Sequence, residues 1–243
     1  MLSSKLVGLS LSTLAVIGIA ACSSASNGRS ATGTSASSSG SAQNGGGYEL
    51  PSTVTSLRID GDAVAVDVTA SDSAKVITVR ENPRGRATTT KDVTASSATL
   101  AAKCPSGFSF GVDCSVDYTV TMPPQVTLTV DGTAGDMKLV GPFDNATISS
   151  KAGRVEGTSL GAGTYVVTTN AGEIKLKFAA PPNSVKVKGD VGEVTLTVPG
   201  GTKYAVTTDT TVGIKNVDVD QDPSSSHRLD VTTTVGAITI NKG

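Results

Sequence analysis

Residues 171–176 read Ala-Gly-Glu-Ile-Lys-Leu, and variants of this stretch recur through the second half of the chain. The variants are Ala134-Gly135-Asp136-Met137-Lys138-Leu139, Ala152-Gly153-Arg154-Val155-Glu156, Val191-Gly192-Glu193-Val194-Thr195-Leu196, Val212-Gly213 and Val235-Gly236-Ala237-Ile238-Thr239-Ile240. Their glycines are 18, 19, 20, 21 and 23 residues apart. A period near 20 residues is typical of a repeat architecture.

Apolar residues alternate with polar ones on both sides of each glycine. Seven and five residues upstream stand Leu128/Val130, Ala146/Ile148, Tyr165/Val167, Val185/Val187, Val206/Thr208 and Leu229/Val231. This alternation predicts two half-buried strands per repeat, joined at a glycine that can take a positive φ. In the Gly213 copy, Ile214 comes early and Lys215 fills an apolar position, so we expect a bulge or a change of register there.

Such a repeat cannot bury its apolar row alone, so the copies must stack. We therefore predict an all-β, single-domain β-solenoid or roll of about six two-strand repeats. An antiparallel β-sandwich remains the alternative. Residues 48–121 lack the repeat glycines but alternate in the same way, with a turn expected at Gly61-Asp62 and a strand that ends at Pro123. The predicted domain spans residues 48–243, with 48–121 as N-terminal capping strands and 122–243 as repeats.

The N-terminus has the features of an export signal. Met1 to Lys5 carries one positive charge, and Leu6 to Ile19 is a mostly apolar run of 14 residues. This run is too short for a membrane span, so we expect residues 1–21 to be a signal peptide that is removed. The sequence Ile19-Ala20-Ala21-Cys22 resembles the bacterial lipobox. The resemblance implies cleavage before Cys22, diacylglycerol on its sulfur and acylation of the new amino group, with palmitate as the expected fatty acid.

The segment after Cys22 is suited to a tether. Residues 23–47 contain 9 Ser, 6 Gly and 4 Ala, and nothing in them can form a core. A chain of this composition is flexible and has a root-mean-square reach of roughly 25–30 Å. We expect residues 22–47 to hold the domain on the extracytoplasmic face of the cell membrane, because more than one acyl chain gives stable anchoring.

Two further cysteines remain, Cys104 and Cys114. In an oxidising exported compartment we expect them to form a disulfide at the tip of a hairpin. The loop between them contains Phe108 and Phe110, which form a weak candidate for an exposed contact patch. A metal site at these cysteines would need more Cys or His nearby, and the sequence has none there.

Composition disfavours several classes of function. The chain has 20 Lys+Arg against 21 Asp+Glu, one His and no Trp. This charge balance provides no basic field for nucleic acid, and one imidazole gives little scope for acid/base catalysis. We therefore expect a monomer that is not an enzyme, with no cofactor and no nucleic-acid partner.

Two motifs could carry chemistry. Gly157-Thr158-Ser159-Leu160-Gly161 fits the nucleophile-elbow pattern, but no helix is expected after it and His227 is the sole candidate base. Asp218, Asp220 and Asp222 resemble the start of a calcium loop, although Pro223 and Leu229 replace the Gly and Glu that an EF-hand needs. These three aspartates are a weak metal candidate, and otherwise form a solvated edge that discourages strand addition.

A family resemblance covers most of residues 50–243. The stretch Asp117-Tyr118-Thr119-Val120-Thr121-Met122-Pro123-Pro124, followed by Val126 to Val130 and Gly135 to Leu139, resembles bacterial putative-adhesin β-strand-repeat domains of unknown function. The resemblance implies an exported or membrane-attached, non-catalytic protein, and the Cys104–Cys114 insertion departs from its pattern. We predict a lipoprotein of the cell envelope that presents its β-repeats for adhesion or contact with a cell-wall or surface component. The alternative is a ligand-binding or envelope-sensing module.

Overall fold

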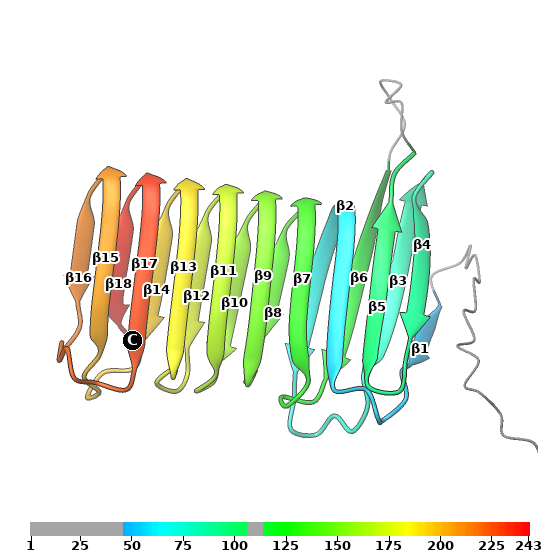
Figure 1. Ribbon diagram of the computed structural model, residues 1–243, viewed down its shortest axis with the longest axis horizontal. Coiled ribbons are helices and arrows are strands. Elements are labelled where there is room, and N and C mark those ends of the chain that lie inside the picture. Colours follow the sequence, from blue (N-terminus) through cyan, green and yellow to red (C-terminus); the bar gives the residue numbers. More distant parts are fainter. Residues whose placement is uncertain (1–45, 106–113) are drawn as a thin grey trace, which may run out of the picture. The chain divides into compact units, whose positions relative to one another are not determined.

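The computed structural model describes residues 46–105 and 114–243, which form eighteen strands and no helix (Figure 1). The described residues form a compact unit with its own apolar core. Within the described ranges, no helix has the length and hydropathy needed to cross a membrane. The predicted signal peptide, Cys22, Phe108 and Phe110 lie outside the described residues.

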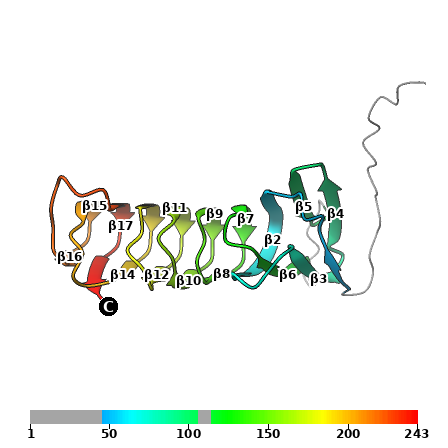
Figure 2. The same ribbon diagram turned by 90° about the horizontal axis from the view of Figure 1, so that it is seen from below.

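The strands form two facing layers, which Figure 2 shows from the end of the strands. One layer contains β1 (Gly47–Glu49), β3 (Thr78–Gly85), β6 (Cys114–Met122), β8 (Met137–Val140), β10 (Val155–Leu160), β12 (Ile174–Phe178), β14 (Val194–Val198), β16 (Lys215–Asp218) and β18 (Ile238–Lys242). The other contains β4 (Thr88–Val93), β5 (Ser97–Lys103), β7 (Thr127–Ala134), β9 (Asn145–Ala152), β11 (Thr164–Ala171), β13 (Ser184–Val191), β15 (Ala205–Val212) and β17 (Arg228–Val235). The long strand β2 (Ser56–Ala70) contributes its first half to the second layer and its second half to the first.

The fold is a β-solenoid. Each coil is a strand in one layer, a corner and a strand in the other layer, and neighbouring coils pair in parallel and in register. The parallel pairing excludes the antiparallel sandwich. Parallel strands need crossover connections, and the return path through the opposite layer supplies them here. The side chains that alternate inward from both layers form one core.

A column of glycines makes the corners possible. Gly135, Gly153, Gly172, Gly192, Gly236 and Gly213 all have φ between +128° and +156°. A Cβ at any of them would lie less than 3.0 Å from a backbone carbonyl oxygen of the adjacent coil. In five of the six, that oxygen belongs to the neighbouring corner glycine. Only glycine permits both this backbone conformation and this spacing.

The described residues form eight parallel coils, the six predicted glycine repeats and two more from the N-terminal region. Besides the six glycine repeats, β2 forms a coil of its own and β5 with β6 forms another. The turn predicted at Gly61-Asp62 does not reverse the chain, because β2 continues through this point from one layer to the other. Residues 48–121 therefore cap the solenoid and also extend it.

The coils do not stack in the order of the sequence. The β2 coil lies between β5/β6 and β7/β8, and the β17/β18 coil lies between β13/β14 and β15/β16 (Figure 1). The Gly213 copy therefore forms the terminal coil. The bulge or register change that we expected there is absent, since β15 and β16 pair in continuous parallel register with β17 and β18. Lys215, the polar residue in an apolar position, therefore lies in the last coil of the stack and causes no bulge.

The opposite end is closed by a coil that runs backwards. β3 pairs antiparallel with β6, β4 pairs antiparallel with β5, and β1 adds to β3. The Tyr48 hydroxyl donates a hydrogen bond to the buried Glu81 carboxylate, and the Lys91 ammonium lies 3.9 Å from the centre of the Tyr48 ring. Burial, followed by this hydrogen bond, raises the pKa of Tyr48. These contacts hold β1, and with it the start of the domain, against the cap.

Cys104 and Cys114 form the predicted disulfide, with their Cα atoms 5.9 Å apart. The bond joins the region just after β5 to the first residue of β6. It therefore closes the corner of that coil at the place where other coils have a glycine.

The glycine column predicts opposite results for two similar substitutions. Gly172→Ala places a Cβ against the Gly153 carbonyl and should lower the free energy of unfolding by roughly 3 kcal/mol. Gly189→Ala, in β13, has an ordinary φ, and its Cβ would come no closer than 3.5 Å to any neighbour, Thr233 Oγ1. It should be neutral or stabilising by up to about 1 kcal/mol. Urea unfolding of both variants checks this, and similar losses for the two would contradict the spacing argument.

The disulfide should contribute about 3 kcal/mol through the entropy of the unfolded chain, given its separation of 10 residues. We expect Cys104→Ser with Cys114→Ser to lower the unfolding midpoint. Dithiothreitol should lower the midpoint of the wild type similarly and leave that of the double variant unchanged. A midpoint of the wild type that does not respond to the reductant would contradict this contribution.

Candidate functional site

The corner edge of the solenoid is the candidate site. The residue before each corner glycine lies beside its counterparts in the adjacent coils, which gives a continuous row across the stack. In spatial order this row is Ala134, Ala152, Ala171, Val191, Val235 and Val212, and it is continued on β2 by Ala63, which precedes Val64. The row thus changes from Ala to Val toward the terminal coil.

Large apolar side chains are exposed at the valine end of this row. The exposed fractions are 54% for Val191, 42% for Val235, 61% for Val212 and 72% for Ile214, which follows Gly213 directly. They are the large exposed apolar side chains found among the described residues. We call these four residues the apolar corner. They lie on three adjacent coils, so they form one patch, and gathered exposed apolar groups mark interaction sites more often than scattered ones do.

The part of the same edge that precedes the apolar corner, in the middle of the stack, is charged. Arg154 Nε lies 3.2 Å and Lys175 Nζ lies 2.9 Å from the Glu173 carboxylate. The hydrogen bond from Lys175, followed by the nearby positive charges, lowers the pKa of Glu173. The Arg154 backbone N–H donates to Asp136 at 2.9 Å. These charges satisfy one another, so the edge presents solvated ion pairs in its middle and apolar groups at the terminal coils.

The sequence analysis did not identify the apolar corner. It quoted the Val-Gly pairs at 191, 212 and 235 but treated them as parts of the repeat. The sequence does change from Ala to Val before the glycine, but period-2 alternation puts this position on the same face as the buried Val185 and Val187 and so predicts burial. Only the corner in the structure turns Val191 outward. The contact patch that we did predict, Phe108 with Phe110, lies outside the described residues.

The three aspartates of the candidate calcium loop do not form a cluster. Asp220 pairs with Lys242 at 3.6 Å, and Asp222 pairs with Lys203 at 3.8 Å and accepts hydrogen bonds from Ser224. The hydroxyl and N–H of Ser224, followed by Lys203, lower the pKa of Asp222. In the described part of the chain, no three Asp, Glu, His or Cys side chains are grouped so as to hold a metal ion.

Ser159 and His227 are not brought together. Ser159 has a φ of 55° and lies in β10, where the pairing with β12 shifts register. His227 precedes β17, three coils away, which is about 14 Å along the stack. The His227 Nδ1 atom is 2.8 Å from the Pro182 carbonyl. A serine nucleophile and its base must approach hydrogen-bond distance, and these two residues do not.

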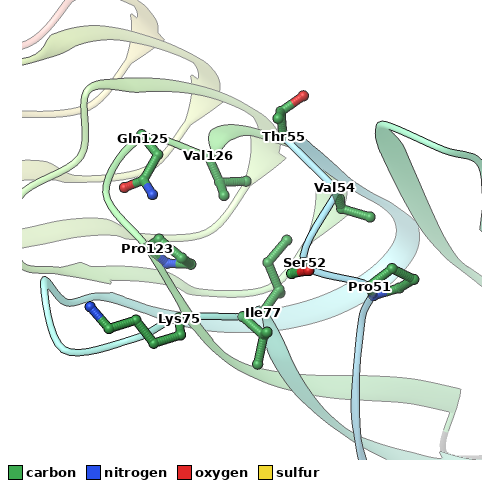
Figure 3. A pocket seen from close by; sticks show the side chains of 10 residues that line it. Pro51, Ser52, Val54, Thr55, Lys75, Ile77, Pro123, Gln125 and Val126 are labelled. Atoms are coloured by element: carbon green, nitrogen blue, oxygen red, sulfur yellow. The ribbon is translucent and has the colours of Figure 1, made fainter.

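The cavities near the N-terminal coils are small or shallow. Figure 3 shows one that is lined by Pro51, Val54, Lys75, Ile77, Pro123 and Gln125, with a volume of about 80 Å³. Pockets for small-molecule ligands usually exceed about 300 Å³. A more open hollow of about 270 Å³ lies beside Arg58, Asp60 and Asp131. Arg58 pairs with both carboxylates there, at 2.8 and 3.4 Å.

Comparisons with known proteins place this geometry in a family. Residues 115–241, more than half of the chain, match the family described as Toastrack DUF4097. Comparison with curated proteins gives no significant match.

Several solved structures are similar to the chain. A putative cell adhesion protein from Clostridium sporogenes is 14% identical, with 82% of this chain and 100% of that chain covered and a TM-score of 0.49. A putative adhesin from Bacteroides fragilis is 15% identical, with 83% and 98% covered and a TM-score of 0.43. A putative lipid binding protein from Parabacteroides distasonis is 13% identical, with 84% and 98% covered and a TM-score of 0.30.

Neither the family description nor the names of these structures specifies an enzymatic activity. The family match spans the C-terminal part of the coil β5/β6 and every glycine repeat up to β18, which are the elements that build the corner edge. The chain is therefore a β-solenoid protein of the Toastrack DUF4097 family.

Proposed function

We propose that this protein is a non-enzymatic lipoprotein of the cell envelope and that its apolar corner binds another envelope component. The observation that carries the proposal is the exposure of Val191, Val212, Ile214 and Val235 on adjacent coils. Burying side chains of this size on binding contributes about 1.5–3 kcal/mol each at full burial. No other described surface gathers large exposed apolar groups in this way.

The chemistry of the apolar corner favours a protein partner. An anionic lipid surface attracts basic groups, but Asp190 and Glu193 flank Val191 in the sequence and Asp209 lies three residues before Val212. Polysaccharides are usually held by aromatic platforms, and the chain has no Trp. A protein surface with apolar side chains and basic neighbours complements both the valines and the acidic groups.

The anchor follows from the N-terminal sequence. Cys22 is proposed to carry the lipid after residues 1–21 are removed, and residues 23–47 are proposed to connect it to β1. The solenoid would then work on the extracytoplasmic face of the membrane, within reach of other envelope proteins. An envelope-sensing module that binds a soluble ligand is the competing function, and the experiments below separate the two.

Substitution of the anchor residue tests attachment. In cells that export the full chain, we expect Cys22→Ser to shift the protein from the membrane fraction to the soluble fraction, because it removes the sulfur that accepts the lipid. Metabolic labelling with a fatty acid should mark the wild type alone. Membrane retention of the unlabelled variant would contradict the anchor without affecting the proposed contact.

Co-sedimentation tests the contact. A protein of residues 36–243, which contains the compact unit, is mixed with isolated cell-wall and membrane fractions, and saturable binding to one fraction is expected. Val212→Thr with Ile214→Thr should weaken this binding about tenfold or more, since two apolar side chains lose their burial. Protease treatment of the fraction should abolish binding if the partner is a protein.

The matched control is Ala134→Ser with Ala152→Ser, at exposed positions in the charged part of the same edge. This control should bind as the wild type does. Equal binding by the Val212/Ile214 variant would remove the apolar corner from the proposal. Absence of binding by the wild type to every fraction would favour the sensing function.

A further inference from the structure

The terminal coil of the solenoid has two free strand edges. Among the described strands, β15 pairs only with β17, and β16 pairs only with β18. Every other parallel coil has a neighbour on both sides. Free edges of this kind are templates for the addition of further strands. The terminal coil therefore offers a second copy of the chain a place to continue the stack.

The interior of this coil differs from that of the coils behind it. In one inward row, Val155, Ile174, Val194 and Ile238 are buried and are followed by Lys215. In a second inward row, Val167, Val187 and Val231 are followed by Thr208. Polar groups thus replace apolar ones in these two rows, while Val206 and Val217 continue two other rows and pack against the core.

Lys215 spans the open end of the core. Its Nζ atom, on β16 in one layer, donates to the backbone carbonyl of Thr208, on β15 in the other layer, at 3.4 Å. An added coil would separate this ammonium group from water and bury it. An unpaired buried charge is strongly unfavourable, so Lys215 opposes addition.

Acidic side chains line the same end. Asp209 on β15, and Asp218 with Asp220 on and after β16, are exposed. Asp220 is paired at 3.6 Å with Lys242, which belongs to β18 of the same end. A second copy that approached through this end would bring identical carboxylates, and like charges on facing strands destabilise their pairing.

We propose that the β15/β16 coil is a polar end cap, with Lys215 at its centre, that prevents end-to-end association with a second copy of the chain. The backward order of the last two repeats fits this role. The apolar copy, with Leu229, Val231, Ile238 and Ile240, is placed inside the stack, and the polar copy is placed last. The cap leaves Val212 and Ile214 exposed beside a free edge without self-association. This inference does not depend on the proposed function.

The test removes the charge and keeps the length of the side chain. Sedimentation velocity of residues 36–243 is measured over a wide range of concentration for the wild type, Lys215→Met and the control Lys177→Met, which changes an exposed lysine of β12. The wild type and the control should remain monomeric. Lys215→Met should form a reversible dimer, with an association constant raised about tenfold or more.

A label locates the dimer contact. Thr207 is exposed on β15, so pyrene attached to Thr207→Cys in the Lys215→Met background should give excimer emission. Pyrene on Thr147→Cys, in β9 at the middle of the stack, should not. Circular dichroism verifies that each variant folds. If Lys215→Met does not fold, Thr208→Val tests the same end of the solenoid, and dimerisation is again expected.

Three results would overturn the proposal. In the first, the wild type dimerises as strongly as Lys215→Met. In the second, Lys215→Met folds but stays monomeric at every concentration. In the third, the dimer forms but pyrene at position 207 gives no excimer emission. None of them bears on whether the apolar corner binds an envelope protein.

Discussion

The contact between corner glycines of adjacent coils is the constraint on which the rest of this structure depends. Each corner must turn within about one residue, and each must leave room for a backbone carbonyl of the neighbouring coil. That requirement aligns each corner with the corner of the neighbouring coil, and the aligned corners set the in-register pairing of the strands in both layers. Once the register is fixed, the alternating residues of all the coils point inward together and bury a common core.

A stack of parallel coils buries the apolar side chains of each repeat, but it leaves unpaired backbone N–H and C=O groups on the strands at both ends. The two ends of this protein handle them differently. A reversed coil of β3 and β4, with β1 held through Tyr48 and Glu81, closes the end at which the domain begins. At the other end, the most polar repeat is placed outermost and the C-terminal repeat is threaded inside it.

The corner edge carries the surface chemistry. Corner residues belong to neither inward face, so the packing of the core leaves their identity free. On the central coils this freedom is used for ion pairs around Glu173, and on the terminal coils for the exposed valines and Ile214. A repeat scaffold can in this way present different chemistry along one edge without altering its core.

The sequence by itself determined the class of fold, the positions of the corners and the disulfide, because these follow from local patterns. Alternation with period 2 requires strands, a recurring glycine requires a tight corner, and the two cysteines of a domain that is expected to be exported are expected to pair. It also indicated that the Gly213 copy is unusual, through Lys215. Only the tertiary structure decided the spatial order of the coils. Each repeat offers strands of nearly the same pattern, so the local sequence does not specify which repeat pairs with which. The same order decided that Val191, Val235 and Val212, up to 44 residues of chain apart, form one patch, and that Ser159 and His227 do not meet.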